Sequence, residues 1–550
     1  MPDFPLTSAH WPADTSAPVL ETTIGSILRD AAARAPDDIA LVSGVPDAGQ
    51  RRQWTYRELL ADAERAARAL LTRFAPGMRV AVWSANSPEW IILDFAAALA
   101  GLTLVTVNPA YQGDELAHVL GHSQADGLVM ADAHQGGDLH AILASVRDGL
   151  PALREVITFG GWDAFTALGT GDAPLPPVAP AGIAQLLYTS GTTGRPKGAL
   201  LTHRALTNNA RLAFQAVGIG PGDVLVNPMP MFHVGGGMFT LGPVTAGAAH
   251  VLMPRFSPTL QLELIETYRA TALLGVPTMM IAMMGSLARA PGRDVSSLRC
   301  AISGGAVSPP ALVRQIESEL GLVYSISLAQ TEASCSITMG SAADSADDRA
   351  QTLGRPLPNS EVRIADLRSG QTAECGVVGE ICARGYQVMH GYLDAPEATA
   401  AAIDADGWLH TGDLGSMDER GYLRVAGRIK DMIIRGGENI YPREIEEVLI
   451  SHPAVADASV LGFPDEHYGE VVAAAIRPAG AVPSAAGAPG APGAPGAGDG
   501  GLAAELAQFC RARLAAYKVP ARWLITDDFP LTASGKIRKD VLCDQLAGQP

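Results

Sequence analysis

The segment Tyr188–Gly198 gathers residue types that bind phosphate. It contains three glycines, three threonines, one serine and one lysine, and it follows the apolar pair Leu186–Leu187. Such a loop can turn tightly, present backbone N–H groups and hydroxyls to phosphate oxygens, and place one cation on them. The common nucleotide P-loop requires Gly-x-x-x-x-Gly-Lys-Ser/Thr, whereas here Pro196 precedes Lys197 and Gly198 follows it. The segment therefore predicts a phosphate-binding loop of another type.

The order of residue types in this segment resembles the phosphate-binding signature of the AMP-forming acid:thiol ligases. This adenylating family includes acyl-CoA synthetases, peptide-synthetase adenylation domains and luciferases. Further blocks follow in the order of that family, and together they cover roughly residues 55–539. These blocks are Pro228–Gly235, Ile302–Ala306, Gln330–Glu332, Trp408–Asp413, Gly427–Pro442 and Pro530–Lys536. The resemblance makes ATP the first ligand to expect.

Composition limits the class of protein. A chain of 550 residues exceeds one ordinary hydrophobic core, so we expect two or more domains. With 47% hydrophobic and 18% charged residues the chain is globular. The net charge of −17 argues against a nucleic-acid partner, because no basic stripe is available to neutralise phosphates. Six scattered cysteines without Cys-x-x-Cys spacing favour a reducing, cytoplasmic location over a disulfide frame or a zinc site.

We expect neither a secretory signal nor a transmembrane segment. Residues Met1–Pro5 contain no positive region followed by an apolar one. The segment Trp90–Val107 is almost wholly apolar and about long enough to span a bilayer. Asp94 interrupts it and Gly101 divides it, so a helix, a turn and a buried parallel strand are the better interpretation. A peripheral membrane contact stays open if the substrate is a lipid.

The alternation of patterns predicts a large α/β domain followed by a small α+β domain. A capping box at Thr55–Glu58 opens an amphipathic helix, and strand-like runs follow at 80–83, 128–130, 156–158 and 271–274. We place the multi-subdomain N-terminal domain at 1–427, a hinge at 428–431 and a small mobile C-terminal domain at 432–550. In the small domain we expect a helix from Pro442 and strands at 455–461 and 471–476. A tract of Ala, Gly and Pro at 484–501 cannot bury a core and is expected to be a disordered insertion. The resemblance implies the same fold, that of adenylate-forming enzymes.

The resemblance also implies a role for each block in binding ATP. The β- and γ-phosphates would be held by residues of the first segment: Thr189, Ser190, Gly191, Thr192, Thr193, Gly194 and Lys197. Glu332 would bind Mg²⁺, which suits one or two protein carboxylates together with phosphate oxygens. Thr331 would contact the α-phosphate. The adenine pocket and the ribose site would comprise Gly304, Gly305, Ala306, Leu328, Gln330, Asp413 and Arg428.

Two half-reactions in turn are implied by the same resemblance. Lys536 would bridge the substrate carboxylate and the α-phosphate during adenylation, a role that suits three donors on a flexible stem. The small domain would then rotate about Lys430. After that rotation Gly436 and Gly437 would line the pantetheine tunnel for coenzyme A, and His233 would be the aromatic gate between acyl group and thiol.

Departures from the family pattern bear on both substrates. The magnesium block usually reads Tyr-Gly-x-Thr-Glu, but this chain has Leu328 and Ala329 in the first two positions, so we expect weaker stacking on adenine. Amino-acid-activating relatives carry an aspartate where this chain has His233, which argues against an amino-acid substrate. The expected acyl pocket is apolar, methionine-lined and roomy. Its residues include Val234, Gly235, Met238, Thr278 and Met279.

These features together predict a ligase that activates a medium- or long-chain fatty acid as acyl-AMP, releases pyrophosphate and transfers the acyl group to coenzyme A. An aryl- or arylalkanoate-CoA ligase is the close second. Enzymes that load an acyl carrier protein carry an extra insertion before the small domain, and we find none before Gly427. A degenerate adenylate-binding protein is the remote alternative. Five retained residues argue against it: Lys197, Glu332, Asp413, Arg428 and Lys536.

Overall fold

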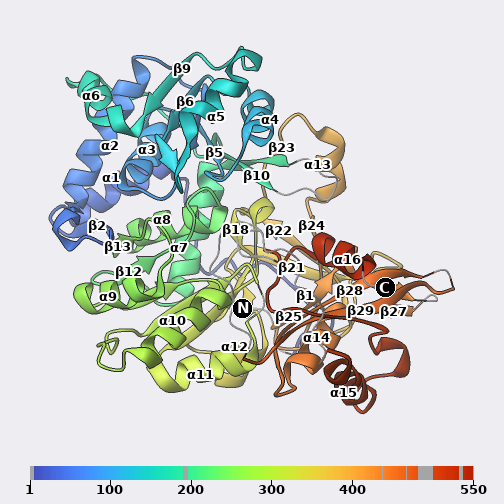
Figure 1. Cartoon of the computed structure of the whole chain (residues 1–550). Helices are drawn as coiled ribbons and strands as arrows, with labels where there is room; N and C mark the ends of the chain where they lie inside the picture. The colour runs from blue at the N-terminus through green and yellow to red at the C-terminus, as the bar shows by residue number, and fades with distance from the viewer. Residues whose placement is uncertain are drawn as a thin grey trace.

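The computed structural model describes residues 5–189, 196–306, 308–435, 438–465, 467–480, 499–531 and 537–548. In Figure 1 the blue and green N-terminal elements form a layered body, and the orange and red C-terminal elements gather at one end of it. Yellow and orange strands of the middle part of the chain, together with one N-terminal strand, form an antiparallel sheet. The order of these parts along the chain agrees with the expected α/β domain followed by a smaller domain.

Two seven-stranded sheets form the frame of the larger part. The first has the order β23–β11–β10–β5–β4–β6–β9, and its strands from β10 to β9 run parallel. The second has the order β16–β15–β14–β12–β13–β2–β3, and only β3 is antiparallel to its neighbour. The strands of the first sheet are β4 (Arg79–Trp83), β5 (Thr103–Val107), β6 (Gly127–Met130), β9 (Glu155–Thr158), β10 (Ile183–Thr189), β11 (Lys197–Thr202) and β23 (Gly391–Tyr392). Those of the second are β2 (Ile39–Ser43), β3 (Gln53–Thr55), β12 (Val224–Asn227), β13 (Ala249–Leu252), β14 (Ala272–Leu274), β15 (Cys300–Gly304) and β16 (Val323–Ser327).

Helices fill three layers around these sheets. Buried apolar side chains of α1, α2, α3, α7 and α8 form one cluster with strands of both sheets, so these helices occupy the layer between them. Helices α4 and α5 pack on the outer face of the first sheet, and α9, α10 and α11 pack on that of the second. Their bounds are α1 (Ile24–Arg34), α2 (Tyr56–Leu71), α3 (Pro88–Leu99), α4 (Gly113–Ser123), α5 (Leu139–Val146), α6 (Trp162–Thr166), α7 (His203–Ala216), α8 (Val234–Ala246), α9 (Pro258–Tyr268), α10 (Pro277–Arg289) and α11 (Pro310–Leu320).

Local sequence accounts for the elements that were predicted. The Thr55 side chain accepts the Glu58 N–H and the Glu58 carboxylate accepts the Thr55 N–H, which completes the expected capping box at the start of α2. Ser87 caps α3, Gly101 turns the chain at a φ of +69°, and β5 follows fully buried. The helix, turn and strand expected over 90–107 are thus confirmed. Within the described ranges, every helix falls short of the length and apolarity that crossing a bilayer requires.

A third, antiparallel sheet carries the block around Asp413. Its order is β1–β21–β22–β24–β25, and its last strand leads into the small domain. Two short strands, β17 (Ala329–Gln330) and β18 (Cys335–Ser336), form a hairpin beside it. The strands of the third sheet are β1 (His10–Trp11), β21 (Ser360–Ala365), β22 (Gly379–Gly385), β24 (Leu409–Met417) and β25 (Leu423–Arg428), and two helices of this region are α12 (Ala346–Gln351) and α13 (Pro396–Ala402).

The small domain contains the predicted helix and strands. Its sheet has the order β27–β26–β29–β28, with β30 parallel to β29. Of the expected insertion at 484–501, residues 484–498 lie outside the described residues. Its last three residues belong to α15, which begins at Asp499, so this helix starts earlier than expected. The elements are β26 (Ile433–Arg435), β27 (Glu438–Ile440), α14 (Pro442–Ile450), β28 (Val455–Asp465), β29 (Gly469–Pro478), α15 (Asp499–Arg511), β30 (Arg522–Ile525) and α16 (Lys539–Ala547).

Close packing of α7 against α8 gives a stability prediction. A Cβ placed on Gly242 of α8 would overlap the ring of Phe214 on α7. We expect Gly242→Ala to lower the free energy of unfolding by about 1–3 kcal/mol, because the ring must move in a packed layer. The control is Gly285→Ala in α10, where the nearest atom to a new Cβ is the tip of Arg289 at 3.6 Å. Thermal unfolding of both variants checks this, and an equal effect in the two would contradict it.

Candidate active site

The two ends of the predicted phosphate-binding segment are held side by side by a hairpin. β10 ends at Thr189, β11 begins at Lys197, and these two residues are direct cross-strand partners. The predicted phosphate ligands between them, Ser190, Gly191, Thr192, Thr193 and Gly194, lie outside the described residues. The hairpin starts at the carboxyl end of the parallel strand β10. That is the edge at which α/β sheets bind ligands.

A buried carboxylate faces this hairpin. Glu332 is 7% exposed, and its Oε1 accepts hydrogen bonds from Tyr392 Oη at 2.7 Å and from Thr189 Oγ1 at 3.5 Å. Lys197 Nζ lies 5.2 Å from the centroid of the Tyr392 ring. Burial, and then the charge of Glu332, raise the pKa of Tyr392, so the phenol stays protonated and donates. Sequence reasoning missed Tyr392, which belongs to no motif and lies 60 residues from Glu332.

The backbone around Tyr392 is fixed from both sides. Met389 N donates to Glu332 O at 2.8 Å, and Leu393 N donates to Gly198 O at 2.8 Å. Gly391 has a φ of +150°, and a Cβ there would come within 2.9 Å of Thr399. Only glycine adopts this conformation readily. The tyrosine is therefore held rigidly over the hairpin that carries Lys197.

The turn that presents Glu332 is strained. Residues Thr331–Ala333 form a single 3₁₀ turn, and the next two residues, Ser334 and Cys335, have φ values of +52° and +108°. Non-glycine residues adopt such angles only where the surroundings impose them, and these sites are commonly functional. Gln330 Nε2 donates to Thr411 O at 3.2 Å, which ties this turn to the strand that carries Asp413.

The predicted adenine wall is a turn between two parallel strands. Gly304 ends β15 and pairs with Ser327, the last residue of β16, while Gly305 has a φ of +77°. Ala306 follows, so the turn lies at the carboxyl edge of the second sheet. Leu328 is 8% exposed and belongs to an apolar cluster with the third sheet. It therefore offers little flat surface to a base.

Asp413 and Arg428, the predicted ribose ligands, are also cross-strand partners. Asp413 on β24 is opposite Arg428 on β25, and Arg428 Nε lies 2.9 Å from Asp413 Oδ1. Asp413 is 6% exposed, and its backbone N–H donates to Thr411 Oγ1 at 3.1 Å. The Thr411 hydroxyl in turn donates to Ile381 O at 2.6 Å. The backbone of Asp413 is thus tied through Thr411 to β22, and its carboxylate is held by Arg428.

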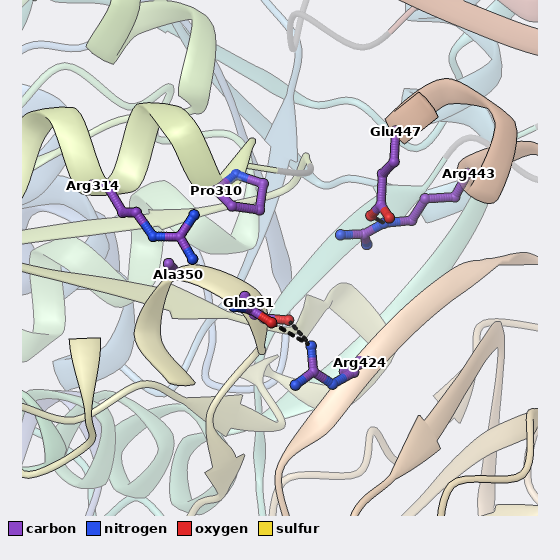
Figure 2. Close-up of a pocket in the computed structure, with 7 residues that line it drawn as sticks. All are labelled: Pro310, Arg314, Ala350, Gln351, Arg424, Arg443 and Glu447. Atoms are coloured by element: carbon purple, nitrogen blue, oxygen red, sulfur yellow. Dashed lines mark hydrogen bonds and ion pairs between the residues drawn. The ribbon is translucent and has the colours of Figure 1, made fainter. Parts of the chain in front are cut away.

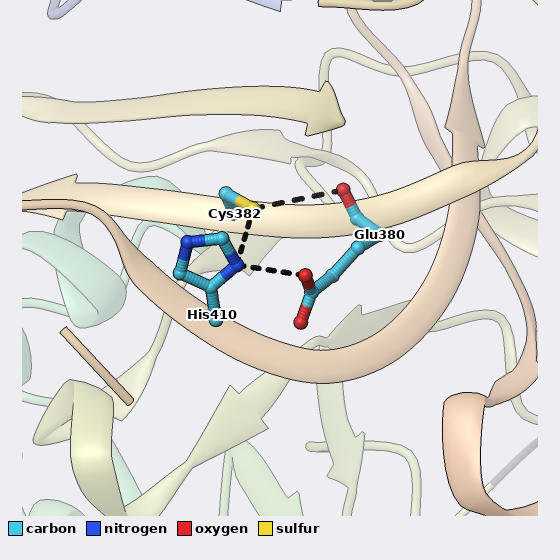
Figure 3. Close-up of side chains that lie close together, drawn as sticks. All are labelled: Glu380, Cys382 and His410. Atoms are coloured by element: carbon cyan, nitrogen blue, oxygen red, sulfur yellow. Dashed lines mark hydrogen bonds and ion pairs between the residues drawn. The ribbon is translucent and has the colours of Figure 1, made fainter. Parts of the chain in front are cut away.

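A second cluster supports this strand, and Figure 3 shows its three residues. Glu380 accepts the Gly412 N–H at 3.0 Å with one oxygen and lies 2.7 Å from His410 Nδ1 with the other. Cys382 Sγ is 3.6 Å from the same His410 nitrogen. The possible ligand atoms of Glu380, Cys382 and His410 lie within 4.8 Å of one another. Burial raises the pKa of the Cys382 thiol to about 12, and the contacts with His410 link the three side chains into one hydrogen-bonded cluster.

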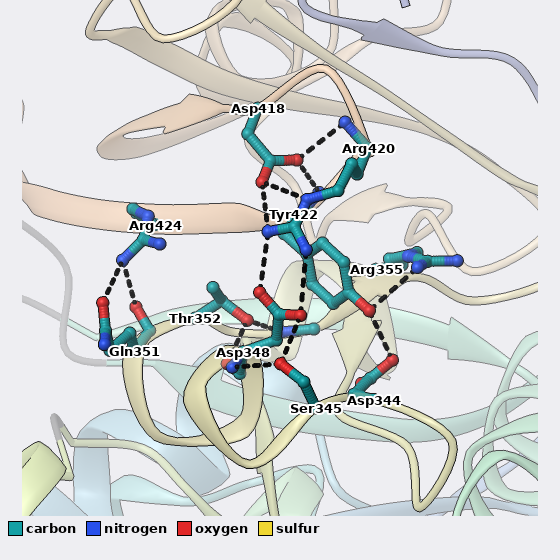
Figure 4. A network of polar contacts seen from close by, with 11 residues as sticks. Asp344, Ser345, Asp348, Gln351, Thr352, Arg355, Asp418, Arg420, Tyr422 and Arg424 are labelled. Atoms are coloured by element: carbon teal, nitrogen blue, oxygen red, sulfur yellow. Dashed lines mark hydrogen bonds and ion pairs between the residues drawn. The ribbon is translucent and has the colours of Figure 1, made fainter. Parts of the chain in front are cut away.

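A polar network beneath the hairpin of β24 and β25 fixes the same site from the other side (Figure 4). Both guanidinium ends of Arg420 bond Asp348 of α12, at 2.7 and 3.0 Å, and Arg420 also bonds Asp418. Arg420 holds the pKa of Asp348 below its usual range. Tyr422 donates to Asp344 at 2.7 Å. The turn between the two strands is thereby anchored to the second sheet.

The predicted gate and acyl residues lie at the starts of two helices, α8 and α10. His233 is the N-cap residue of this helix, and its ring centroid is 4.2 Å from that of Phe232. A Cβ on Gly235 would meet no atom of the described residues within 4 Å, so this side of the helix faces open space among them. Val234 and Met238 are buried, and Met238 Sδ is 3.4 Å from Ser336 Oγ. At the start of α10, Thr278 is exposed and Met279 half-buried.

The predicted hinge is exposed, and a cavity lies between the two domains. Lys430 is in a 3₁₀ turn after β25, with an exposed side chain. Figure 2 shows the cavity, which has a volume of about 240 Å³. It is lined from the large domain by α11, α12 and β25, and from the small domain by α14: Pro310, Arg314, Ala350, Gln351, Arg424, Arg443 and Glu447. Gly436, Gly437 and Lys536 lie outside the described residues.

Comparison with known proteins identifies the family. The family model for AMP-binding enzymes matches residues 28–393, and that for their C-terminal domain matches 444–536. The putative acyl-CoA synthetase YngI of Bacillus subtilis is 37% identical over 95% of this chain and 97% of its own. The mitochondrial medium-chain acyl-CoA ligase ACSF2 of Rattus norvegicus is 32% identical over 97% and 89%. ATP-bound MatB of Rhodopseudomonas palustris superposes with a TM-score of 0.83 at 28% identity, covering 96% of this chain and 99% of that one.

The chain belongs to the AMP-binding enzymes. Within them it is an AMP-forming acid:CoA ligase, which uses ATP and coenzyme A with a small-molecule acid. The apo form of the same MatB superposes less well, with a TM-score of 0.75 against 0.83 for the ATP-bound form. The arrangement described here is therefore nearer to the nucleotide-bound one.

The bond between Tyr392 and Glu332 gives a prediction. We expect Tyr392→Phe to lower the rate of acyl-adenylate formation about ten- to hundred-fold, because a hydrogen bond to a buried charge is lost next to Lys197. Transfer from supplied acyl-AMP to coenzyme A should change little. The control is Tyr56→Phe, which removes a buried hydroxyl bonded only to backbone carbonyls of Pro243 and Ala248. Half-reaction rates measured separately check this, and equal loss in both would contradict it.

Proposed function

We propose that this ligase activates a medium- or long-chain fatty acid. The observation that carries the proposal is the start of α8, where open space beside Gly235 adjoins the buried apolar residues Val234 and Met238. Open space lined by apolar side chains suits an alkyl chain rather than a dicarboxylate or a sugar acid. The named activity of the ACSF2 relative, a medium-chain acyl-CoA ligase, supports the same choice.

Magnesium is proposed as the metal of this site, held by Glu332. The Oε1 atom of Glu332 is engaged by Tyr392 and Thr189, whereas its Oε2 makes no hydrogen bond within the described part of the chain. A carboxylate oxygen of this kind, beside the ends of the phosphate loop, fits Mg²⁺, which keeps several waters and binds phosphate oxygens as well. When bound, the ion would neutralise charge on the phosphates of ATP.

In the first half-reaction, a carboxylate oxygen of the acid attacks the α-phosphorus, the bond to pyrophosphate breaks and acyl-AMP forms. Thr189 and Lys197, with the loop between them, would hold the β- and γ-phosphates, and Thr331 would contact the α-phosphate. The turn Gly304–Ala306 would receive the adenine, beside Leu328 and Gln330. Asp413 and Arg428 would hold the ribose. Preorganised donors of this type stabilise developing charge without reorganising.

The thiol of coenzyme A attacks the acyl carbonyl in the second half-reaction, and AMP leaves. We propose that residues 1–427 bind ATP and acid, and that residues 432–550 rotate about the hinge at Lys430. The exposure of Lys430 and the cavity between the domains support this motion. Rotation would withdraw Lys536 and bring Gly436 and Gly437 to the thiol channel, with His233 at the junction. We further propose a cytoplasmic location, on the scattered cysteines.

One assay tests the proposed substrate. Pyrophosphate release is measured with a panel of unsubstituted fatty acids, aryl acids and arylalkanoic acids, with and without coenzyme A. We expect the highest kcat/KM for a medium- or long-chain fatty acid, and acyl-CoA formation only when free coenzyme A is present. A higher kcat/KM for an aryl acid than for every fatty acid would contradict the proposed substrate. Transfer only to an acyl carrier protein would contradict coenzyme A as the acceptor.

The role of Lys536 makes a second prediction. Lys536→Ala should slow adenylation about 10²–10³-fold, the usual cost of removing one preorganised electrostatic donor, and should spare thiolation of a supplied acyl-adenylate. Lys539→Ala is the matched control, because the Lys539 ammonium donates to Val460 O at 2.8 Å within the small domain. An equal fall of both half-reactions in Lys536→Ala would contradict a lysine that serves only the first step.

A further inference from the structure

A buried carboxyl group lies in the layer between the two sheets, outside every motif of the family. Asp94 is 1% exposed on α3, a helix that is otherwise apolar after its first turn. Its Oδ1 accepts a hydrogen bond from Gln185 Nε2 at 2.9 Å. Its Oδ2 is buried and has no hydrogen-bond partner among the described residues. Burying an unsatisfied polar atom costs stability, so this oxygen calls for an explanation.

The geometry of β10 connects this pair to the site. Gln185, Leu187 and Thr189 alternate along β10, so their side chains project from one face of the strand. Leu187 lies in the apolar cluster between the sheets, and Thr189 contacts Glu332. Four residues of strand correspond to about 13 Å, so Gln185 lies that far from the phosphate end. This separation suits the remote part of an acyl chain rather than the reacting carboxylate.

Helix α8 approaches the same pair from the other side. A Cβ placed on Gly237 would lie 3.8 Å from Gln185 Oε1. Gly237 N donates to His233 O at 3.1 Å, so one helical turn separates the gate residue from the residue that faces Gln185. Gly235, two residues before Gly237, lies toward the opposite side of the helix. A chain that enters beside His233 and runs along the face of Gly237 is therefore directed toward Gln185 and Asp94.

We propose that Asp94 and Gln185 form a polar subsite that receives a hydroxyl group on the remote part of the acyl chain. The proposal rests on the proposed function, in which the acid enters along α8. It narrows the substrate class from an unsubstituted fatty acid to a hydroxylated one.

A hydroxyl group suits this subsite in either protonation state of Asp94. Burial raises the pKa of Asp94 to about 6, and the Gln185 hydrogen bond opposes that rise. A hydroxyl donates to Oδ2 when the carboxyl is ionised and accepts from it when the carboxyl is protonated. An unsubstituted alkyl chain would leave Oδ2 without a partner inside the layer, and sites built around a polar group discriminate strongly against ligands that lack it.

The test compares acids that differ only at the far end. Hexanoate, octanoate and decanoate are paired with the same acids carrying a terminal hydroxyl, and kcat/KM is measured from pyrophosphate release. The double variant Asp94→Leu/Gln185→Leu replaces both partners by apolar groups, a change that is commonly near neutral for stability. The comparison is made at the chain length for which the hydroxylated acid is the best substrate of the wild type. At that length we expect the ratio of kcat/KM for the hydroxylated acid to kcat/KM for the unsubstituted acid to fall at least about ten-fold in the double variant. The KM for ATP of the double variant should stay within about two-fold of the wild-type value, a difference no larger than the effect of one weak surface contact.

Two further variants separate recognition from packing. Asp94→Asn keeps a group that can both donate to and accept from a hydroxyl, so its ratio should stay within a few-fold of the wild type. Gln261→Leu is the matched control, because Gln261 is 1% exposed on α9 and both its amide atoms are buried without a hydrogen bond in the described part of the chain. It should leave the ratio unchanged.

Failure of the subsite proposal can be distinguished from failure of the proposed function. If the wild type releases pyrophosphate with no fatty acid of the panel, the proposed function itself is wrong. If the wild type is active but prefers the unsubstituted acid at every length, the subsite is wrong. The same holds if the double variant leaves the wild-type ratio unchanged or shifts it no more than Gln261→Leu. Should the double variant fail to fold, Asp94→Leu alone takes its place under the same criterion.

Discussion

The contact of Glu332 with Tyr392 and Thr189 is the constraint on which the site depends. It joins a strained turn after the second sheet to the hairpin of the first sheet, through one carboxylate oxygen. A buried carboxylate is costly unless its partners are fixed, and here both partners stand on strands. Lys197 is aligned by the same arrangement, because it pairs with Thr189 and lies beside the Tyr392 ring. Displacing any one of these groups would disturb the charge balance of the whole cluster.

Asp413 and Arg428 lie where the chain passes from the large domain to the small one, and a separate set of contacts holds them in place. Arg420 and Asp348 anchor the turn of their hairpin, and Glu380 holds the backbone next to Asp413. Only one residue, Ile429, separates Arg428 from the exposed Lys430, the proposed hinge. A rigid hairpin that ends at an exposed turn can hold the proposed ribose site in place while the following domain changes position. The two TM-scores for MatB fit such a change, as the same protein with and without ATP differs in its match to this chain.

Most of the architecture could be predicted from the sequence, because capping, turn residues and buried apolar runs are local signals. The capping box at Thr55 and the helix and strand around Gly101 are examples. The ordered motifs also indicated the ligase family. Tyr392 could not be found this way, since a lone tyrosine far from Glu332 carries no pattern. In the sequence Asp94 is only an interruption of an apolar run, because its pairing with Gln185 depends on how α3 packs against β10.

The glycines of α8 show how packing and substrate choice are coupled in this fold. A Cβ on Gly236 would overlap the backbone of Pro230, and one on Gly242 would overlap the Phe214 ring, so both positions serve close packing. Gly235 faces open space and Gly237 faces Gln185, so neither of these is needed for packing in the same way. A side chain added at Gly237 would fill the proposed path toward Asp94, whereas one at Gly235 would fill the space on the other side of the helix. Either change would leave the helix in place, so the proposed substrate preference could change at both positions without loss of the frame that holds His233.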